Sequence, residues 1–204
     1  MRLGAVAGAL AASVLLLAGC SGAASQEPPA APAAVEADEL LAPHGLAGLD
    51  AKQVIDELEA TPVAERPKDL MASVQPEELV LSNARGEEAR LPMPEDEFYV
   101  SVAPYAEATH ECHFHSLTSC LGELSNEQIG IEAEAVGGEN TGAGAWSLAE
   151  QRTTADNGFA GVWLPRDREI ALRITHEGGV AERVISTGEP DAPTCITTMR
   201  LGAA

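Results

Sequence analysis

The chain has 204 residues, of which 12 are basic and 32 are acidic, so its formal net charge at pH 7 is −20. A surface of this sign repels nucleic acid, and an aromatic content of 3% offers few side chains on which bases could stack. Cations would concentrate near such a surface, although many carboxylates also serve solubility alone. Composition therefore argues against a nucleic-acid partner and is compatible with a cationic ligand.

The first residues predict export and lipid attachment. An apolar run follows Arg2 and ends in Leu17-Ala18-Gly19-Cys20, the order that a lipoprotein signal peptidase recognises. We expect residues 1–19 to be removed as a signal peptide and Cys20 to become the acylated N-terminus. Residues 20–38 then predict a flexible tether. The expected location is extracytoplasmic, on a membrane through Cys20; an ordinary secretory signal with an incidental cysteine is the alternative.

Residues 39–77 predict a helical N-terminal segment. Asp50 can cap a helix over residues 50–59, because Gln53 occupies the capping-box position. The apolar residues of this helix share one face: Val54, Ile55 and Leu58. A second short helix is expected over residues 67–74, since proline suits a first helical turn.

From residue 78 onward the period changes to two, which predicts an antiparallel β domain over residues 78–204. Glu177-Gly178-Gly179 predicts a hairpin turn, and residues 137–144 a loop. Trp146 and Trp163 are expected to be large residues of the core. The fold class is α+β, a short helical segment followed by a mainly antiparallel, sandwich-like β domain. The candidate strands are 79–81, 98–102, 110–115, 128–135, 146–153, 161–164, 169–175, 181–186 and 195–201.

The segment 109–115 concentrates ligands for soft or borderline metals, with one thiol and three imidazoles: Cys112, His110, His113 and His115. Thiolate and imidazole suit Cu(I) and Zn(II), and they suit Mg or Ca poorly. In a regular strand, His110 and Cys112 share one face, so His110 is the imidazole expected beside Cys112. The opposite face would carry His113 and His115, either to capture a second ion or as solvent-facing polarity.

Three cysteines remain once Cys20 is committed to lipid: Cys112, Cys120 and Cys195. An odd number cannot all pair, so at least one thiol stays free outside the cytoplasm. Either the three form a metal site, or one structural disulfide leaves an inert cysteine. If Cys112 and Cys120 cooperate, the chain must reverse between them, because a regular strand or helix would separate them too far. A sheet would have to bring Cys195 alongside, and a three-thiolate set would suit Cu(I).

Other chemistries fit poorly. The sequence has no Gly-x-Ser-x-Gly elbow, no P-loop, no Gly-x-Gly-x-x-Gly after a strand, no His-Glu-x-x-His and no Cys-x-x-Cys. A hydrolase of the Cys–His type lacks a recognisable orienting residue or oxyanion hole. These absences direct attention to binding by the cysteines and histidines.

Four separated groups of residues resemble the CueP family of periplasmic copper-binding proteins. They are Phe98–Tyr105, Cys112–Cys120 with Gly122-Glu123, Asn157-Gly158-Phe159 with Trp163–Asp167, and Thr194–Thr198. The resemblance runs from about Leu40 to Leu201, and the family's motif cysteines fall on Cys112, Cys120 and Cys195. It implies copper binding outside the cytoplasm for copper tolerance or delivery, conversion of Cu(II) to Cu(I), and a two-part, dimeric architecture. The lipobox and the tether depart from the family.

The sequence thus leads to a first hypothesis, a lipid-anchored protein that binds Cu(I) through Cys112, Cys120 and Cys195. Auxiliary ligands would be His110, His113 and His115, and zinc is the alternative metal. Oxidation of two thiols could reduce Cu(II) stoichiometrically, so we expect a binding protein more than an enzyme. Expected partners are a thiol reductase, a copper-accepting protein and a second copy. The alternatives are a surface interaction lipoprotein with one disulfide and a thiol–disulfide exchange protein.

Overall fold

The computed structural model describes residues 33–137 and 145–203. The expected signal peptide, Cys20, most of the tether and nearly all of the expected loop 137–144 lie outside the described residues. Pro32–Ala204 forms one compact unit. Within the described residues, none of the helices has the length and apolar character needed to cross a bilayer.

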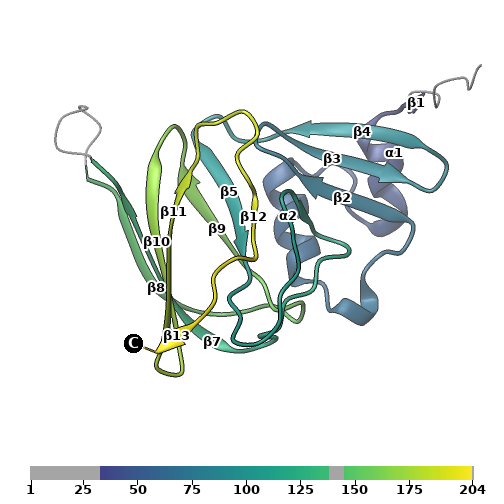
Figure 1. The fold of residues 1–204 in the computed structure, drawn as a ribbon. Helices are drawn as coiled ribbons and strands as arrows, with labels where there is room; N and C mark the ends of the chain where they lie inside the picture. The colour runs from purple at the N-terminus through teal and green to yellow at the C-terminus, as the bar shows by residue number, and fades with distance from the viewer. Residues whose placement is uncertain (1–32, 138–144, 204) are drawn as a thin grey trace, which may run out of the picture. The chain divides into compact units, whose positions relative to one another are not determined.

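Short helices come first along the chain and strands follow (Figure 1). The helices are α1 (Ala37–Leu41), η1 (Ala42–His44), α2 (Ala51–Ala60) and η2 (Val63–Glu65). The longer strands are β2 (Leu70–Val74), β3 (Glu78–Asn83), β4 (Glu87–Pro92), β5 (Glu97–Val102), β7 (Gln128–Ala135), β8 (Ser147–Thr153), β9 (Ala160–Pro165), β10 (Glu169–His176) and β11 (Gly179–Ser186). Two-residue strands are β1 (Ala33–Ala34), β6 (His115–Ser116), β12 (Cys195–Ile196) and β13 (Gly202–Ala203).

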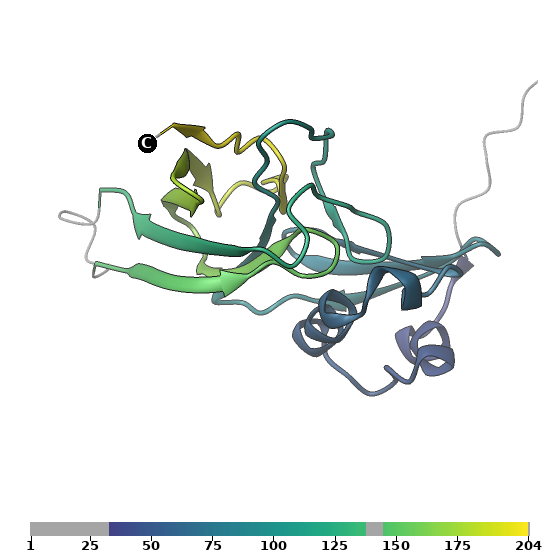
Figure 2. The same ribbon diagram turned by 90° about the horizontal axis from the view of Figure 1, so that it is seen from below.

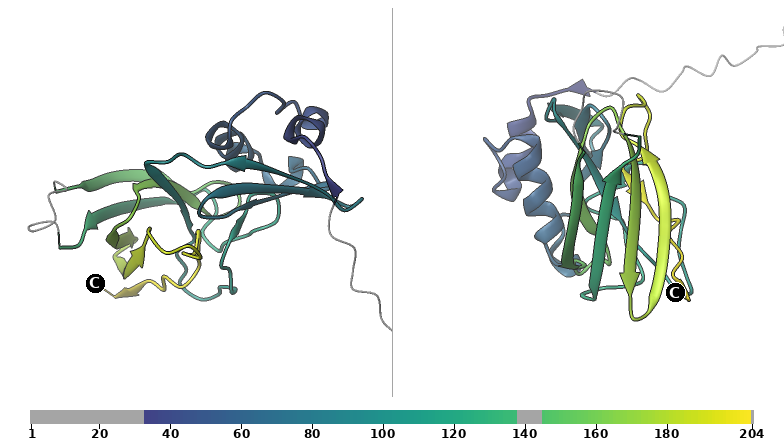
Figure 3. Two further views of the ribbon diagram at one scale, coloured as in Figure 1. Left: turned by 90° about the horizontal axis from the view of Figure 1, so that it is seen from above. Right: turned by 90° about the vertical axis from the view of Figure 1, so that its left-hand side faces the viewer.

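The N-terminal part packs α1 and α2 against one face of a sheet ordered β1-β4-β3-β2-β6, as the views from below and above show (Figures 2 and 3). The Asp50 carboxylate accepts from Gln53 N–H while the Gln53 side chain accepts from Asp50 N–H, so the predicted capping box forms. Buried apolar residues of the helices and strands make one core: Leu40, Leu41, Val54, Ile55, Leu58, Leu70, Ala72, Val74, Leu79 and Leu81.

The C-terminal part is a sandwich of two sheets, ordered β12-β5-β9 and β13-β11-β10-β7-β8. Alternate residues of the facing strands fill the second core, among them Phe98, Val100, Val102, Ile129, Ile131, Val162, Leu164, Ile170, Leu172 and Ile174. At the end of β10, Glu177 and Gly178 both have positive φ, of 43° and 80°, which suits a two-residue hairpin loop. The predicted α+β class with a mainly antiparallel β domain is confirmed.

Strand β5 belongs to both cores, because its residues after Glu97 are buried on both faces. Phe98, Val100 and Val102 face the sandwich core, whereas Tyr99 packs in the N-terminal core. A strand buried on both faces appears in sequence as a continuous apolar run. This strand therefore joins the helical segment to the sandwich, beside the cysteines.

Three element predictions are wrong. Residues 67–74 do not form a second helix, because Leu70, Ala72 and Val74 alternate with exposed or half-buried residues and the segment pairs with β3. Residues 110–114 are not a strand; only His115 and Ser116 pair, with β2. The strand predicted over residues 195–201 is limited to Cys195–Ile196. In addition, β2 and β4 are not among the strands predicted from the sequence.

The expected roles of the tryptophans need correction. Trp146 and Trp163 are only half-buried and pack at the margins of the two cores. The largest fully buried side chains are instead Phe98 and Phe159. Trp163 lies against Tyr99, with ring centroids 5.0 Å apart, and beneath the Lys52 ammonium at 4.6 Å. An aromatic side chain with a polar edge suits such a margin.

Candidate thiol and histidine site

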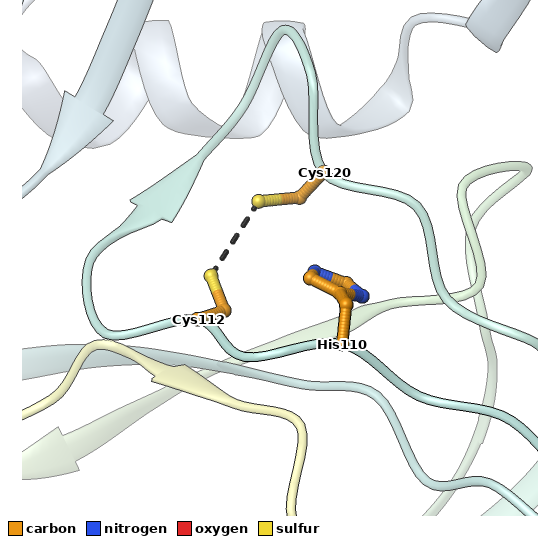
Figure 4. Close-up of side chains that lie close together, drawn as sticks. All are labelled: His110, Cys112 and Cys120. Atoms are coloured by element: carbon orange, nitrogen blue, oxygen red, sulfur yellow. Dashed lines mark hydrogen bonds between the residues drawn. The ribbon is translucent and has the colours of Figure 1, made fainter.

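The three cysteines meet at one place, between the two cores. Cys112 and Cys195 form a disulfide, with their Cα atoms 5.6 Å apart. Cys120 is a free thiol, and its Sγ lies 3.6 Å from Cys112 Sγ. Figure 4 shows the Cys112 and Cys120 side chains pointing toward each other, with His110 beside them. Sulfur atoms that are distant in sequence therefore occupy one cluster.

Backbone hydrogen bonds explain how these residues come together. A turn over Ser116–Ser119 reverses the chain, and Cys120 N–H donates to Ser116 O at 3.1 Å. The carbonyl of His113 accepts from the N–H groups of Thr194 and Cys195, which fixes the loop against β12. Strand β12 in turn pairs with β5 in parallel. The cysteines thus converge through a turn, a loop contact and a sheet.

Two sets of possible ligand atoms share Cys120. His110, Cys112 and Cys120 form one set, and His115, Cys120 and Cys195 form the other; within each set the atoms lie within 4.8 Å of one another. His110 is exposed and Cys112 half-buried, whereas His115 and Cys195 are buried. The cluster therefore has an exposed outer half, His110 and Cys112, and a buried inner half, His115 and Cys195, and Cys120 belongs to both sets.

The inner half lies against Glu59, a charged side chain from the N-terminal segment that sequence reasoning missed. Glu59, at the end of α2, has its Oε1 2.8 Å from His115 Nε2. The same carboxylate accepts from Tyr99 Oη at 2.6 Å and from Ser101 Oγ at 3.1 Å. Neither ring nitrogen of His115 forms an aligned hydrogen bond among the described residues, so the contact with Glu59 is an ion pair by distance alone. Nothing in sequence spacing relates Glu59 to His115.

Burial by itself would raise the pKa of Glu59, but hydrogen bonds and the charge of His115 lower it to about 2. Burial would likewise lower the pKa of His115, yet Cys120 and Glu59 raise it to about 9. Tyr99 is buried beside the carboxylate, so its pKa lies well above 10.0. Each member of the pair therefore favours the charged form of the other.

The Cys120 thiol is affected by the same charges. Burial raises its pKa, but His115, the Ser116 N–H and Arg66 outweigh burial, and the net pKa is lowered. Arg66 is only 6% exposed and donates from Nη1 to Cys120 O at 2.9 Å. A thiol of lowered pKa next to a disulfide sulfur is a better nucleophile and metal ligand than an ordinary cysteine.

Phe159 and a close pair of glycines form the wall behind the cluster. Phe159 is fully buried, and its ring centroid lies 4.6 Å from that of His115. A Cβ on Gly158 would lie 2.6 Å from Gly122 O, and Gly158 has a φ of +79°. Only glycine satisfies both conditions without strain. The Asn157-Gly158-Phe159 turn therefore holds the aromatic ring against His115.

The predicted site residues have different outcomes. The structure brings together all three cysteines with His110 and His115. Of the two roles left open for His115, solvent-facing polarity is wrong, because its side chain is 0% exposed and the segment is not a regular strand. His113 is exposed, and its Nε2 lies 2.8 Å from Asp191 O. His113 belongs to neither ligand set of the described residues.

This arrangement can perform two kinds of chemistry. Once the Cys112–Cys195 disulfide is reduced, three thiolates with one or two imidazoles can bind a soft cation such as Cu(I). A thiol in contact with a disulfide sulfur can also attack it, which is the first step of thiol–disulfide exchange.

Comparisons with known proteins identify the family of this chain. The family model "Periplasmic copper-binding protein CueP" matches residues 53–200, a range that contains all three cysteines of the cluster. No curated protein matches significantly. The crystal structure of S.CueP is similar, with a TM-score of 0.71 and 34% sequence identity. The match covers 81% of this chain and 96% of S.CueP. With more than half of its length matched, the chain belongs to the CueP family of periplasmic copper-binding proteins.

Proposed function

We propose that this protein binds Cu(I) outside the cytoplasm through the thiolates of Cys112, Cys120 and Cys195. The observation that carries this proposal is the convergence of three sulfur atoms, one of them a free thiol 3.6 Å from the disulfide. Soft thiolates favour Cu(I) strongly, and the adjacent imidazoles of His110 and His115 add borderline ligands. Zinc suits the same atoms and remains the competing metal.

The proposed function includes reduction of Cu(II). Cys112 and Cys195 as thiolates would give up two electrons on forming their disulfide, enough to convert two Cu(II) ions to Cu(I). Cys120 would stay reduced and help to hold the product. An external dithiol would then reduce the disulfide and become oxidised itself. We therefore propose a stoichiometric reaction that depends on a thiol reductase, and a downstream protein that accepts Cu(I).

The N-terminal sequence supports attachment to a membrane through a lipid on Cys20, although that residue lies outside the described part of the chain. A lipid anchor would keep copper handling at the membrane surface. Labelling with a radioactive fatty acid tests this part: wild type is expected to incorporate label, and Cys20→Ser is expected to incorporate none.

Competition for Cu(I) tests the binding proposal. The reduced protein is titrated with Cu(I) against a chromogenic chelator, together with Cys120→Ser and Cys195→Ser. Substitution of a residue that only supports a metal ligand weakens metal binding by up to roughly 100-fold. We expect each of these cysteine substitutions to weaken Cu(I) binding by more than that. Tight binding that survives both substitutions together would overturn the proposal. The same titration with Zn(II) decides between the two metals.

Thiol–disulfide exchange is a second candidate function, because Cys120 has a lowered pKa and contacts the sulfur of Cys112. Exchange with a small dithiol in the absence of metal would support it. If exchange is fast and Cu(I) binding is weak, this function replaces copper binding.

A further inference from the structure

A carboxylate from the helical segment reaches the inner half of the thiol cluster. Glu59 lies in the last turn of α2, and its side chain is only 14% exposed. Tyr99 and Ser101, both on β5, donate hydrogen bonds to its Oε1. Asn157 Nδ2 donates to Oε2 at 3.3 Å. Three donors from two segments therefore fix the position of the carboxylate, independently of the cysteines.

This fixed carboxylate lies against the imidazole of His115. The Nε2 atom is 2.8 Å from Glu59 Oε1, and the Phe159 ring packs against the imidazole. His115 is fully buried, and neither of its ring nitrogens forms an aligned hydrogen bond among the described residues. A ring nitrogen also lies within 4.8 Å of the Sγ atoms of Cys120 and Cys195. Nε2 thus lies at ion-pair distance from a fixed carboxylate, and no hydrogen bond among the described residues satisfies Nδ1.

A buried polar atom without a partner is costly, so it commonly indicates a missing ligand. Histidines that bind metal regularly have their other nitrogen held by a carboxylate, which fixes the orientation of the ring. We propose that Glu59 is a positioning residue, which holds His115 Nε2 so that Nδ1 faces a Cu(I) ion bound by Cys120 and Cys195. This inference rests on the proposed function and assigns part of the site to the N-terminal segment.

A double-mutant cycle tests whether Glu59 acts through His115. Cu(I) affinity of the reduced full-length protein is measured against a chelator for Glu59→Gln, His115→Gln and the double variant. Glu59→Gln is expected to weaken binding by about 10- to 100-fold. In the His115→Gln background it is expected to cause no further loss, because no ring remains to be positioned. Equal losses in both backgrounds, or no loss from a folded Glu59→Gln protein, would overturn the inference.

Glu57→Gln is the matched control, since Glu57 is exposed on the same helix and the substitution removes the same charge. It is expected to leave Cu(I) affinity unchanged. A general effect of negative charge on copper binding would instead weaken both variants alike, which also contradicts a specific role for Glu59.

A measurement on the wild-type protein covers the case in which Glu59→Gln does not fold. Nitrogen-15 NMR of His115 is recorded for the reduced protein with and without Cu(I). The resonance of Nδ1 is expected to shift, while Nε2 keeps its proton. If Nε2 loses its proton instead, or neither nitrogen shifts although copper binds through the cysteines, only the inference about Glu59 fails. If copper does not bind through the cysteines at all, the proposed function fails with it.

Discussion

The outer and inner halves of the thiol cluster are built differently. The outer half, His110 and Cys112, lies on a loop without regular structure and is exposed or half-buried. The inner half, His115 and Cys195, lies on paired strands and is buried. Cys120 contacts both halves. The framework of the fold fixes one side of the site, while the other side stays accessible to ions and thiol partners.

Contacts with other segments strengthen this difference. His115 N–H donates to Thr194 Oγ1 at 3.0 Å, and that hydroxyl donates to Val74 O at 2.6 Å. Exposed hydrogen bonds hold the start of the outer loop, where the Glu123 carboxylate accepts from the N–H groups of Ala106, Glu107 and Ala108. Buried hydrogen bonds between strands resist opening more than exposed bonds to a loop do.

Two phenylalanines provide the strongest test of this difference. Phe159→Ala removes a fully buried ring behind the inner half, so we expect a loss of about 3–5 kcal/mol in the free energy of unfolding. Phe114→Ala, in the outer loop, removes a half-buried ring and should cost about 1 kcal/mol. Denaturant unfolding of the oxidised proteins measures both values. Similar losses for the two variants would contradict the division into halves.

Two glycines test the turn that supports the inner half. Gly158→Ala and Gly178→Ala both place alanine at positive φ, which costs about 1–2 kcal/mol. A Cβ at position 158 also meets the backbone of Gly122, whereas a Cβ at position 178 meets nothing within 4 Å. We therefore expect Gly158→Ala to be more destabilising by about 1–3 kcal/mol. Equal losses in denaturant unfolding would show that the close approach of the two glycines is unimportant.

The smallest predicted effect concerns the outer loop and pH. Backbone hydrogen bonds, first from Ala108 and then from Glu107 and Ala106, lower the pKa of Glu123 below the ordinary value of 4.5. A lowered pKa in the folded protein means that the contribution to stability is present above pH 4.5 and is lost as the pH falls through the folded value. Acidification should therefore reduce the hydrogen-exchange protection of the Ala108 amide.

In the Glu123→Gln variant, the backbone amide of Ala108 should have low hydrogen-exchange protection at every pH, because the neutral side chain at position 123 no longer titrates. Glu111→Gln, in the same loop, is the control and should behave as the wild type does. If protection in the wild type is independent of pH, Glu123 does not hold the loop.

Local sequence patterns predicted those elements whose contacts are local. The capping box at Asp50 and the alternation of β7 and β10 are examples, and the glycine hairpin at Glu177-Gly178 is another. The alternation argument failed at residues 110–114, because polar residues that alternate in a loop resemble those of a strand. Proline at position 67 predicts the start of a helix, whereas Leu70–Val74 carries the alternation of a paired strand and forms β2.

The site could be predicted only in part. The resemblance to a family identified Cys112, Cys120 and Cys195 together, since motif residues stay recognisable at any separation in sequence. Glu59 and Arg66 could not be found in this way, because they belong to no motif and approach His115 and Cys120 only in the folded chain. A buried charged residue at the end of an amphipathic helix is the one signal that could have suggested Glu59.

The central claim is that three distant cysteines form one Cu(I) site, and X-ray absorption at the copper edge tests it most directly. The reduced protein is loaded with one equivalent of Cu(I) and compared with Cys195→Ser. We predict monovalent copper with three sulfur neighbours in the wild type and fewer in the variant. An unchanged sulfur count in Cys195→Ser, or copper bound mainly by nitrogen and oxygen in the wild type, would contradict the account.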